Sequence, residues 1–287
     1  MARGTLRRLL EHGLGAPGRA LLAWRTRGQA ERLFAQRGLT HAATRLAAGL
    51  QDIVSAGPFR GLHYPRHRGD IVHLAKLLGA YERELHVAVE RLILRQPRLI
   101  VNVGSGDGYY AVGLARRLSA AGVTTRVVAV DPDPLAQRAC RATARRNVVA
   151  DMVVPMVRVD TAMLERLLRQ ARAAESARLP EAPPSRSLVL VDAEGFEDAL
   201  LDPVRAPALA QTDLLVETHD FAAPGVTARL TARFERTHDV ERIEVAARDA
   251  ADFPLLAGEP AAVSAGLVDE FRHQPQSWLV LTARAVT

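Results

Sequence analysis

Short apolar runs alternate with longer segments of helical periodicity over most of this chain. Runs rich in apolar and β-branched residues occupy positions 99–103, 127–131, 152–159, 188–192, 214–220, 240–246 and 278–283, and we expect each run to form a strand. After the third run, Met163 to Leu168 place apolar residues on one helical face, and the Pro-rich stretch 173–187 predicts a surface loop. The pattern predicts an α/β fold with a doubly wound, seven-stranded, mostly parallel sheet over about residues 97–287.

A glycine-rich turn follows the first run. Gly104, Gly106 and Gly108 come directly after it and precede a helical pattern. Open α/β sheets bind nucleotide-like ligands at the carboxyl end of a strand, and glycine lets the ligand lie against bare backbone there. A dinucleotide fingerprint would place its third glycine at position 109, which is Tyr109, so the spacing disfavours a nicotinamide cofactor. A tight strand-to-helix turn can also need glycine for steric reasons alone.

The second run ends in a carboxylate. Asp131 follows the run and is itself followed by Pro132, Asp133 and Pro134. A carboxylate can accept hydrogen bonds from both hydroxyls of a ribose, so we expect Asp131 to bind the ribose of an adenosine cofactor. The alternative is that Asp131 is a turn or cap residue. Asp133 and Pro134 predict the N-cap and the first residue of the next helix.

The turn from residue 104 to 108, Gly-Ser-Gly-Asp-Gly, resembles motif I of class I S-adenosylmethionine (SAM)-dependent methyltransferases. Asn102 departs from that motif, because those enzymes usually carry Asp or Glu there. The resemblance implies the Rossmann-like methyltransferase fold and SAM as the cofactor. We expect SAM to contact residues at the ends of the first three strands, namely Gly104, Ser105, Gly106, Asp131, Pro132 and Asp160.

A second motif follows the fourth strand. Residues 192–197 read Asp-Ala-Glu-Gly-Phe-Glu and resemble the D-x-E-G-x-E signature of FkbM-type methyltransferases. The two motifs are similar to that family in order and spacing across roughly residues 99–220. The resemblance implies O-methylation of a hydroxyl on a small metabolite or glycan. The sequence has no Asn/Asp-Pro-Pro-Tyr motif, which is typical of amino-group methyltransferases.

The ends of the fourth and fifth strands supply candidate catalytic residues. An alcohol acceptor must lose a proton, which requires a general base. His219 is the best candidate, because its ordinary pKa lies near neutrality, and Asp192 and Glu217 can orient it or the substrate. A hydrogen-bonded histidine at a strand end is the simpler structural alternative. The oxygens here could also hold Mg²⁺, but no metal ligand set is predicted.

The N-terminal region is predicted to be helical. Leucine and valine residues recur at helical spacing over residues 71–95 and predict one amphipathic helix. We expect residues 1–96 to form a helical extension that caps the cofactor site, and residues 97–287 to form the SAM-binding methyltransferase domain. Glu82 lies at the margin of the apolar stripe, where it could reach the amino end of SAM or pair with a surface arginine.

Composition is that expected of a cytoplasmic enzyme. The chain of 287 residues can bury one sizeable core. Cys140 is its only cysteine, which excludes an intramolecular disulfide and agrees with a reducing compartment. No apolar stretch is long enough for a transmembrane helix, so we expect no membrane span.

Positive charge is concentrated near the start of the chain. Residues 1–70 contain 12 arginines and 4 acidic residues. A basic face could attract an anionic substrate, a membrane surface or nucleic acid, but a solvated helical surface is the simpler interpretation, and no nucleic-acid module accompanies it. The expected partner is therefore a small hydroxylated acceptor. The alternatives are an RNA- or nitrogen-directed methyltransferase of the same fold and a non-catalytic SAM-binding module.

Overall fold

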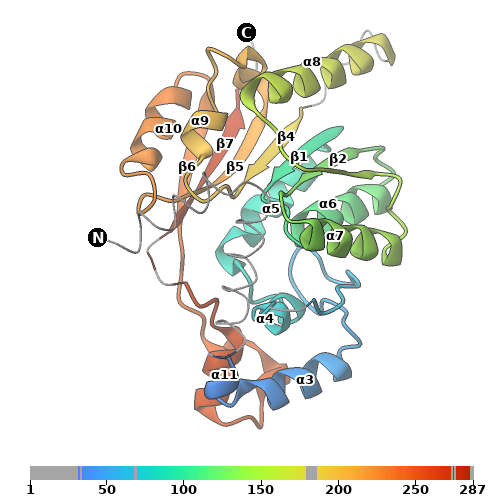
Figure 1. Ribbon diagram of the computed structural model, residues 1–287, viewed down its shortest axis with the longest axis vertical. Coiled ribbons are helices and arrows are strands. Elements are labelled where there is room, and N and C mark those ends of the chain that lie inside the picture. Colours follow the sequence, from blue (N-terminus) through green and yellow to red (C-terminus); the bar gives the residue numbers. More distant parts are fainter. Residues whose placement is uncertain are drawn as a thin grey trace. The chain divides into compact units, whose positions relative to one another are not determined.

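The computed structural model describes residues 32, 34–67, 70–178, 186–272, 274 and 276–284 (Figure 1). The chain divides into two compact units. The first, here called the helical unit, consists of Met1–Tyr81, Pro132–Leu135 and Arg248–Phe271. The second, the sheet unit, consists of Glu82–Asp131, Ala136–Ala247 and Arg272–Thr287.

The sheet unit contains seven strands in the order β3-β2-β1-β4-β5-β7-β6. The strands are β1 Leu99–Val103, β2 Arg126–Val130, β3 Val153–Met156, β4 Leu188–Val191, β5 Asp213–Thr218, β6 His238–Glu244 and β7 Ser277–Ala283. β1 to β5 are parallel, and β7 runs antiparallel to both β5 and β6. The predicted seven-stranded, mostly parallel sheet is confirmed.

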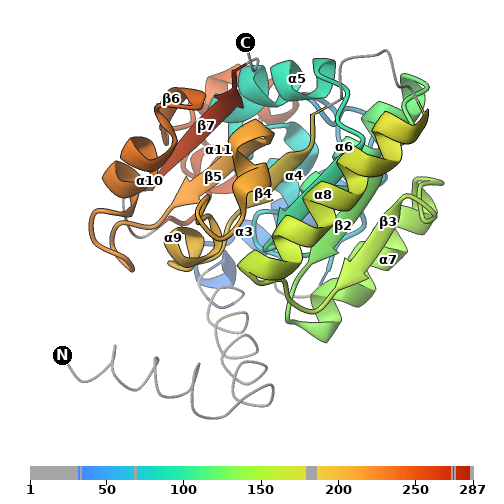
Figure 2. The ribbon, with the colours of Figure 1, turned by 90° about the horizontal axis from the view of Figure 1, so that it is seen from above.

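Helices lie on both sides of this sheet (Figure 2). They are η1 Arg83–Leu85, α5 His86–Leu94, α6 Tyr109–Ala120, α7 Pro134–Arg146, α8 Thr161–Arg178, α9 Glu197–Leu200, η2 Pro207–Gln211 and α10 Val226–Phe234. Asp133 caps α7 as predicted, because its Oδ1 accepts the N–H of Leu135 at 2.8 Å. None of the described helices is long and apolar enough to cross a membrane.

An apolar core lies between one face of the sheet and helices α8, α9 and α10. Val101, Val189 and Val216 point into it from neighbouring strands, and Leu164 of α8 and Leu230 of α10 pack against them. Side chains alternate between the two faces of a strand, so the residues between these valines point to the opposite face. Burial of both faces explains why the central strands read as continuous apolar runs.

The strand register brings the carboxyl ends of four strands to one edge. Val103 lies opposite Val130 of β2 and Val191 of β4, and Val191 lies opposite Val216 of β5. The strand order reverses between β1 and β4, which makes this edge a topological switch point. Residues that follow β1, β2, β4 and β5 therefore gather where open α/β sheets bind their ligands.

The single helix predicted over residues 71–95 is wrong. α4 covers only His73–Leu78, and the chain then passes through Gly79 at φ 70° and Glu82 at φ 47° before η1 and α5 begin. Left-handed glycine is typical of a helix C-terminus, and a Cβ at Gly79 would lie 2.7 Å from the backbone of Ala56. Both flanking helices bury apolar residues, so the apolar spacing continues across the break and periodicity alone did not reveal it.

Several other boundaries differ from the prediction. β3 ends at Met156 and not at residue 159, and β6 begins at His238, two residues earlier than expected. Residues 173–178 belong to α8 and not to the predicted loop, because Ala, Arg and Glu favour helix. The predicted loop positions 179–185 lie outside the described residues.

The helical unit contains α3 Leu39–Gly49, α4, η3 Ala250–Asp252, η4 Pro254–Leu256 and α11 Ala261–Val268. α11 packs on α3, where a Cβ at Gly266 would lie 2.9 Å from the methyl groups of Leu39. Arg37 also pairs with Asp269 at 3.0 Å. These contacts join residues 248–271 to the N-terminal segment, a grouping that the linear division at residue 96 did not anticipate. That residues 1–96 cap the cofactor site stays a prediction.

Candidate functional site

The glycine turn, residues 104–108, places its three glycines in different surroundings. A Cβ at Gly104, where φ is 78°, would lie 1.9 Å from the backbone oxygen of Asp192. A Cβ at Gly108, where φ is 94°, would lie 2.9 Å from Sγ of Cys140. At Gly106, where φ is 52°, no described atom lies within 4 Å of the Cβ position. Packing explains two of these glycines, and Gly106 alone among the three leaves the predicted room for a ligand.

Backbone hydrogen bonds fasten the glycine turn to the end of β2. The N–H groups of Gly104 and Ser105 donate to the carbonyl of Val130 at 2.9 and 3.0 Å. The N–H of Gly106 donates to Oδ2 of Asp131 at 2.9 Å. A carboxylate offers about four acceptor sites, so Asp131 can also accept hydrogen bonds from a ligand. The structure therefore brings together four of the predicted cofactor-binding residues.

Asn102 contributes a buried polar atom on β1. Its side chain is 1% exposed, and its Oδ1 has no hydrogen-bond partner among the described residues. Val101 and Val103 pack against the core beneath α8 to α10, so Asn102 points to the opposite face of the sheet. A buried amide oxygen without a partner costs free energy, which a donor group on a ligand would recover.

Residues at the end of β5 and in the segments after β4 and β5 form what we call the carboxylate–histidine cluster: Asp192, Glu194, Glu197, Glu217 and His219. Nδ1 of the fully buried His219 lies 2.6 Å from Oε1 of the fully buried Glu197. Nε2 of His219 lies 3.6 Å from Oδ1 of Asp192 and 4.0 Å from Oε2 of Glu217. Glu197 therefore orients the imidazole, whereas Asp192 and Glu217 were predicted to orient either the imidazole or the substrate.

Crowding of negative charge shifts two pKa values in this cluster. Desolvation and the neighbouring carboxylate of Glu217 raise the pKa of Asp192 well above its ordinary range. Burial opposes protonation of His219, but its hydrogen bond to Glu197 and the charge of Glu217 outweigh burial and raise its pKa above 6.5. A histidine whose pKa is raised from 6.5 can hold or release a proton at working pH.

Arg272 connects two buried carboxylates beside the cluster. Its guanidinium bonds Glu217 through Nη1 and Glu82 through Nη2, the latter at 2.6 Å. The hydroxyl of Tyr110 donates to the same Glu82. Sequence reasoning missed Arg272, because it lies in no motif and pairs with a residue 190 positions away. It also gave no role to Tyr110, although Tyr110 follows the glycine turn directly after Tyr109.

The remaining predicted residues have other surroundings. Glu82 is 1% exposed and pairs with an arginine, as one of its two predicted roles required, but the pair is buried and Glu82 lies outside any helix. Asp160 caps α8, because its Oδ1 accepts the N–H of Met163 at 2.8 Å. Pro132 falls in the segment Pro132–Leu135 of the helical unit. Cofactor contacts by these three residues stay predictions.

The cluster also contains a possible set of metal ligands. Asp192, Glu194 and His219 each offer one ligand atom, and these three atoms lie within 4.8 Å of one another. No metal ligands were predicted from the sequence, and Glu194 was not among the predicted site residues. Its signal was present in the sequence as the third position of the D-x-E-G-x-E pattern.

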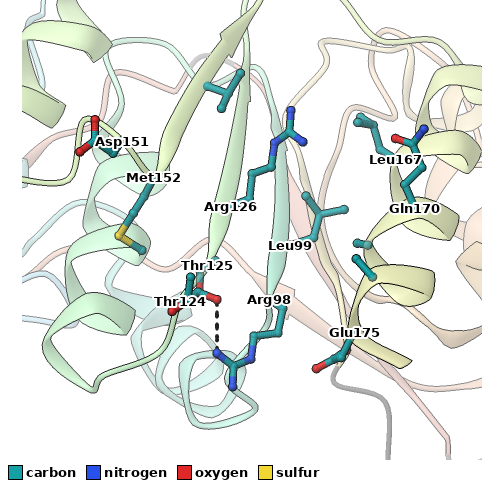
Figure 3. Close-up of a pocket in the computed structure, with 13 residues that line it drawn as sticks. Arg98, Leu99, Thr124, Thr125, Arg126, Asp151, Met152, Leu167, Gln170 and Glu175 are labelled. Carbon is teal, nitrogen blue, oxygen red and sulfur yellow. Dashed lines mark hydrogen bonds between the residues drawn. The ribbon is translucent and has the colours of Figure 1, made fainter. Parts of the chain in front are cut away.

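A cavity of about 830 Å³ lies elsewhere in the sheet unit (Figure 3). It is lined by Arg98, Leu99 and Arg126 at the amino ends of β1 and β2, and by residues of α8 that include Leu167 and Glu175. Arg98 donates to the backbone oxygen of Thr124 across its floor at 3.4 Å. The cavity therefore lies at the opposite ends of the strands from the glycine turn and holds none of the candidate site residues.

The sheet and its ligand edge together define the class of fold. β1 to β5 are parallel, and the last strand in the sequence, β7, is antiparallel and lies between β5 and β6 in the sheet. The glycine turn follows the first strand at the switch point, as in a Rossmann-like cofactor domain. The sheet unit has the Rossmann-like methyltransferase fold.

Several solved structures are similar to the chain. The O-methyltransferase TomG from Streptomyces achromogenes is 15% identical, with 77% of this chain and 83% of that chain covered and a TM-score of 0.40. A putative O-methyltransferase from Klebsiella pneumoniae is 13% identical, with 74% and 88% covered and a TM-score of 0.41. An O-methyltransferase from Bacillus cereus is 12% identical, with 90% and 91% covered and a TM-score of 0.38. No family model and no curated protein sequence matches the chain.

Proposed function

We propose that this protein is a SAM-dependent methyltransferase that methylates a hydroxyl group on a small metabolite or glycan. The observation that carries the proposal is the pairing of two features at one sheet edge. One is an open glycine, Gly106, tied to the strand-end carboxylate Asp131. The other is a buried histidine, His219, held by the carboxylate of Glu197.

The glycine turn fits the proposed cofactor. Gly106 leaves bare backbone open, and Asp131 at the end of β2 can accept hydrogen bonds from the ribose hydroxyls. The buried amide oxygen of Asn102, which has no partner among the described residues, can accept a hydrogen bond from an ammonium group. SAM, when bound, supplies a methyl group that is already activated for transfer to oxygen.

The carboxylate–histidine cluster fits a hydroxylated acceptor. His219 presents Nε2 toward Asp192, and its Nδ1 is held by Glu197, so the ring is fixed in one orientation. At Nε2 it takes the proton of the acceptor hydroxyl, and the carboxylate of Glu197 stabilises the resulting imidazolium. Asp192 and Glu217 position the acceptor. Much of the remaining rate comes from holding the acceptor in line with the methyl group.

FkbM-type membership is the finer part of the proposal. The three acidic positions of the D-x-E-G-x-E pattern are Asp192, Glu194 and Glu197. All three belong to the carboxylate–histidine cluster, and each lies near or against His219. A motif whose acidic residues converge on one imidazole supports a catalytic use. We further propose that the enzyme is cytoplasmic.

Calorimetric titration with S-adenosylhomocysteine (SAH), the demethylated product, tests the proposed function. We expect saturable SAH binding and no binding of NAD, because Tyr109 occupies the position of the third dinucleotide glycine. Transfer from labelled SAM to a panel of phenols, sugars and polyketide alcohols then identifies the acceptor. If SAH does not bind, the proposal is wrong. If SAH binds and labelled RNA or amines are the acceptors, the hydroxyl assignment is wrong.

A further inference from the structure

We propose that Asp192, Glu194 and His219 bind a divalent transition-metal ion, with open coordination positions for the acceptor hydroxyl. The metal site itself follows from the geometry of these residues, and only the acceptor's place on it rests on the proposed function. The three residues lie in the loops after β4 and β5 and all belong to the sheet unit.

The spacing of the three ligand atoms fits one ion. Nitrogen and oxygen ligands bind such ions at about 2.0 to 2.2 Å, so two ligands of one ion lie up to roughly 4.4 Å apart. Nε2 of His219 and Oδ1 of Asp192 are 3.6 Å apart, within this limit. With Glu194 the three atoms lie within 4.8 Å of one another, and the exposed side chain of Glu194 can rotate closer to an ion. The 3.6 Å separation is too long for a direct hydrogen bond and suits two ligands on either side of an ion.

The imidazole of His219 is prepared for ligation. Its Nδ1 lies 2.6 Å from Glu197, so in the neutral ring Nδ1–H donates and the lone pair sits on Nε2. That Nε2 is buried and has no hydrogen-bond partner among the described residues. A carboxylate that holds the distal nitrogen of a metal-binding histidine is the usual supporting arrangement in metalloproteins. This buried lone pair lies on the side of the ring that faces Asp192.

The charge around the site also favours a cation. Arg272 pairs with Glu217 and Glu82. Within the part of the chain that the structure describes, neither Asp192 nor Glu194 pairs with an arginine or lysine. The two negative charges of Asp192 and Glu194, with a neutral His219, would balance the charge of a divalent cation.

The ligand set selects the class of ion. An imidazole nitrogen suits Mn²⁺, Co²⁺ or Zn²⁺ better than Mg²⁺ or Ca²⁺, which prefer all-oxygen sites. Three protein ligands leave positions for water or an acceptor hydroxyl, and a bound ion lowers the pKa of that hydroxyl. The role of His219 as a base therefore applies to the metal-free chain. In the metal-bound chain it acts as a ligand.

Titration of the full-length, chelator-treated protein with Co²⁺ and Mn²⁺ tests the site. We expect about one ion per chain, visible Co²⁺ absorption bands, and one exchangeable, paramagnetically shifted proton NMR signal from the His219 Nδ1–H that faces Glu197. Glu194→Gln, which changes an exposed side chain and leaves the core intact, should weaken Mn²⁺ binding about 10- to 100-fold, as should Glu197→Gln. Glu235→Gln, at another exposed position, is the matched control.

Two results would overturn the metal site. One is the absence of a shifted histidine signal when Co²⁺ binds, and the other is Mn²⁺ affinity in Glu194→Gln equal to that in Glu235→Gln. The same preparations are titrated with SAH, which does not need these ligands. SAH binding without specific metal binding removes the metal site and leaves the proposed function standing. Metal binding without SAH binding would keep the metal site and remove the proposed SAM-dependent function.

Discussion

The two halves of the candidate site, the glycine turn and the carboxylate–histidine cluster, differ in the groups that form them: backbone in the first and side chains in the second. At the glycine turn, the ends of β1 and β2 are joined by main-chain hydrogen bonds, and the surface offered to a ligand is bare backbone at Gly106. At the ends of β4 and β5, the site consists of charged side chains that surround His219. A backbone site leaves its trace as glycine spacing, whereas a side-chain site depends on which residues tertiary packing brings together.

The glycine turn itself contains a smaller contrast. Gly104 touches the backbone of Asp192 and so joins the two halves of the site, whereas Gly106 faces open space. A motif match treats the glycines alike, but the structure separates packing from ligand binding. Substitutions can test that separation.

The largest effect is expected from Gly104→Ala. A Cβ 1.9 Å from a backbone oxygen cannot be accommodated without moving β1 away from β4. We expect a loss of more than about 4 kcal/mol in the free energy of unfolding, measured with urea. Gly122→Ala is the matched control, because its φ of 73° is similar but no described atom lies within 4 Å of the Cβ position. Equal losses in the two variants would contradict the contact with Asp192.

His219→Gln tests whether the side-chain half carries the chemistry. We expect kcat on the true acceptor to fall by about 10²- to 10⁴-fold, with SAH affinity unchanged, because the base or metal ligand is lost while the glycine turn is intact. His238→Gln is the control at a second buried histidine, which bonds the carbonyl of Thr212 at 2.8 Å. That variant should lose stability and keep its turnover. Equal kcat in both variants would exclude His219 from catalysis.

Asp131→Ala tests the backbone half. Loss of charge-assisted hydrogen bonds to the ribose should cost about 1.5 to 3 kcal/mol of SAH binding, measured by calorimetry. Asp202→Ala removes a carboxylate that also accepts a backbone N–H, from Val204 at 2.9 Å, and should lower stability by about 1 kcal/mol while SAH affinity holds. SAH affinity in Asp131→Ala equal to that of the parent would show that this carboxylate serves only the turn.

Gly106→Ala should reduce SAH binding much more than it reduces folding. The left-handed φ of 52° costs an alanine about 1 to 2 kcal/mol, with no clash to add to it. The variant should therefore fold, and its SAH affinity should fall because the methyl group occupies the open space. A variant that folds and binds SAH as tightly as the parent would show that no ligand approaches this position.

The smallest effect concerns pH. Burial lowers the pKa of His238 below 6.5, so the folded state resists its protonation. Stability from neutral His238 is complete above pH 6.5 and is lost as the pH falls below that value, by at most about 1.4 kcal/mol per pH unit. Urea unfolding of the parent and of His238→Gln at pH 7.5 and 5.5 isolates this contribution. Identical pH dependence in the two proteins would contradict it.

Much of the fold could be predicted from the chain itself. The central strands are buried on both faces, so each reads as an unbroken apolar run, and the run at 99–103 coincides with β1. Local chemistry also placed the Asp133–Pro134 start of α7. The break at Gly79 was missed, because the residues on both sides of it are apolar at helical spacing whether or not the helix is continuous.

By itself, the sequence determined the strands, the glycine turn and the strand-end acidic residues, because each is encoded within a few neighbouring positions. Only the tertiary structure decided that Gly104 serves packing while Gly106 stays open, and that Glu197 holds His219. It likewise brought Arg272 to Glu82 across 190 positions. Hydrogen bonds and ion pairs between residues far apart in the sequence form only where the folded sheet places those residues next to each other. Local sequence patterns do not encode which distant residues become neighbours.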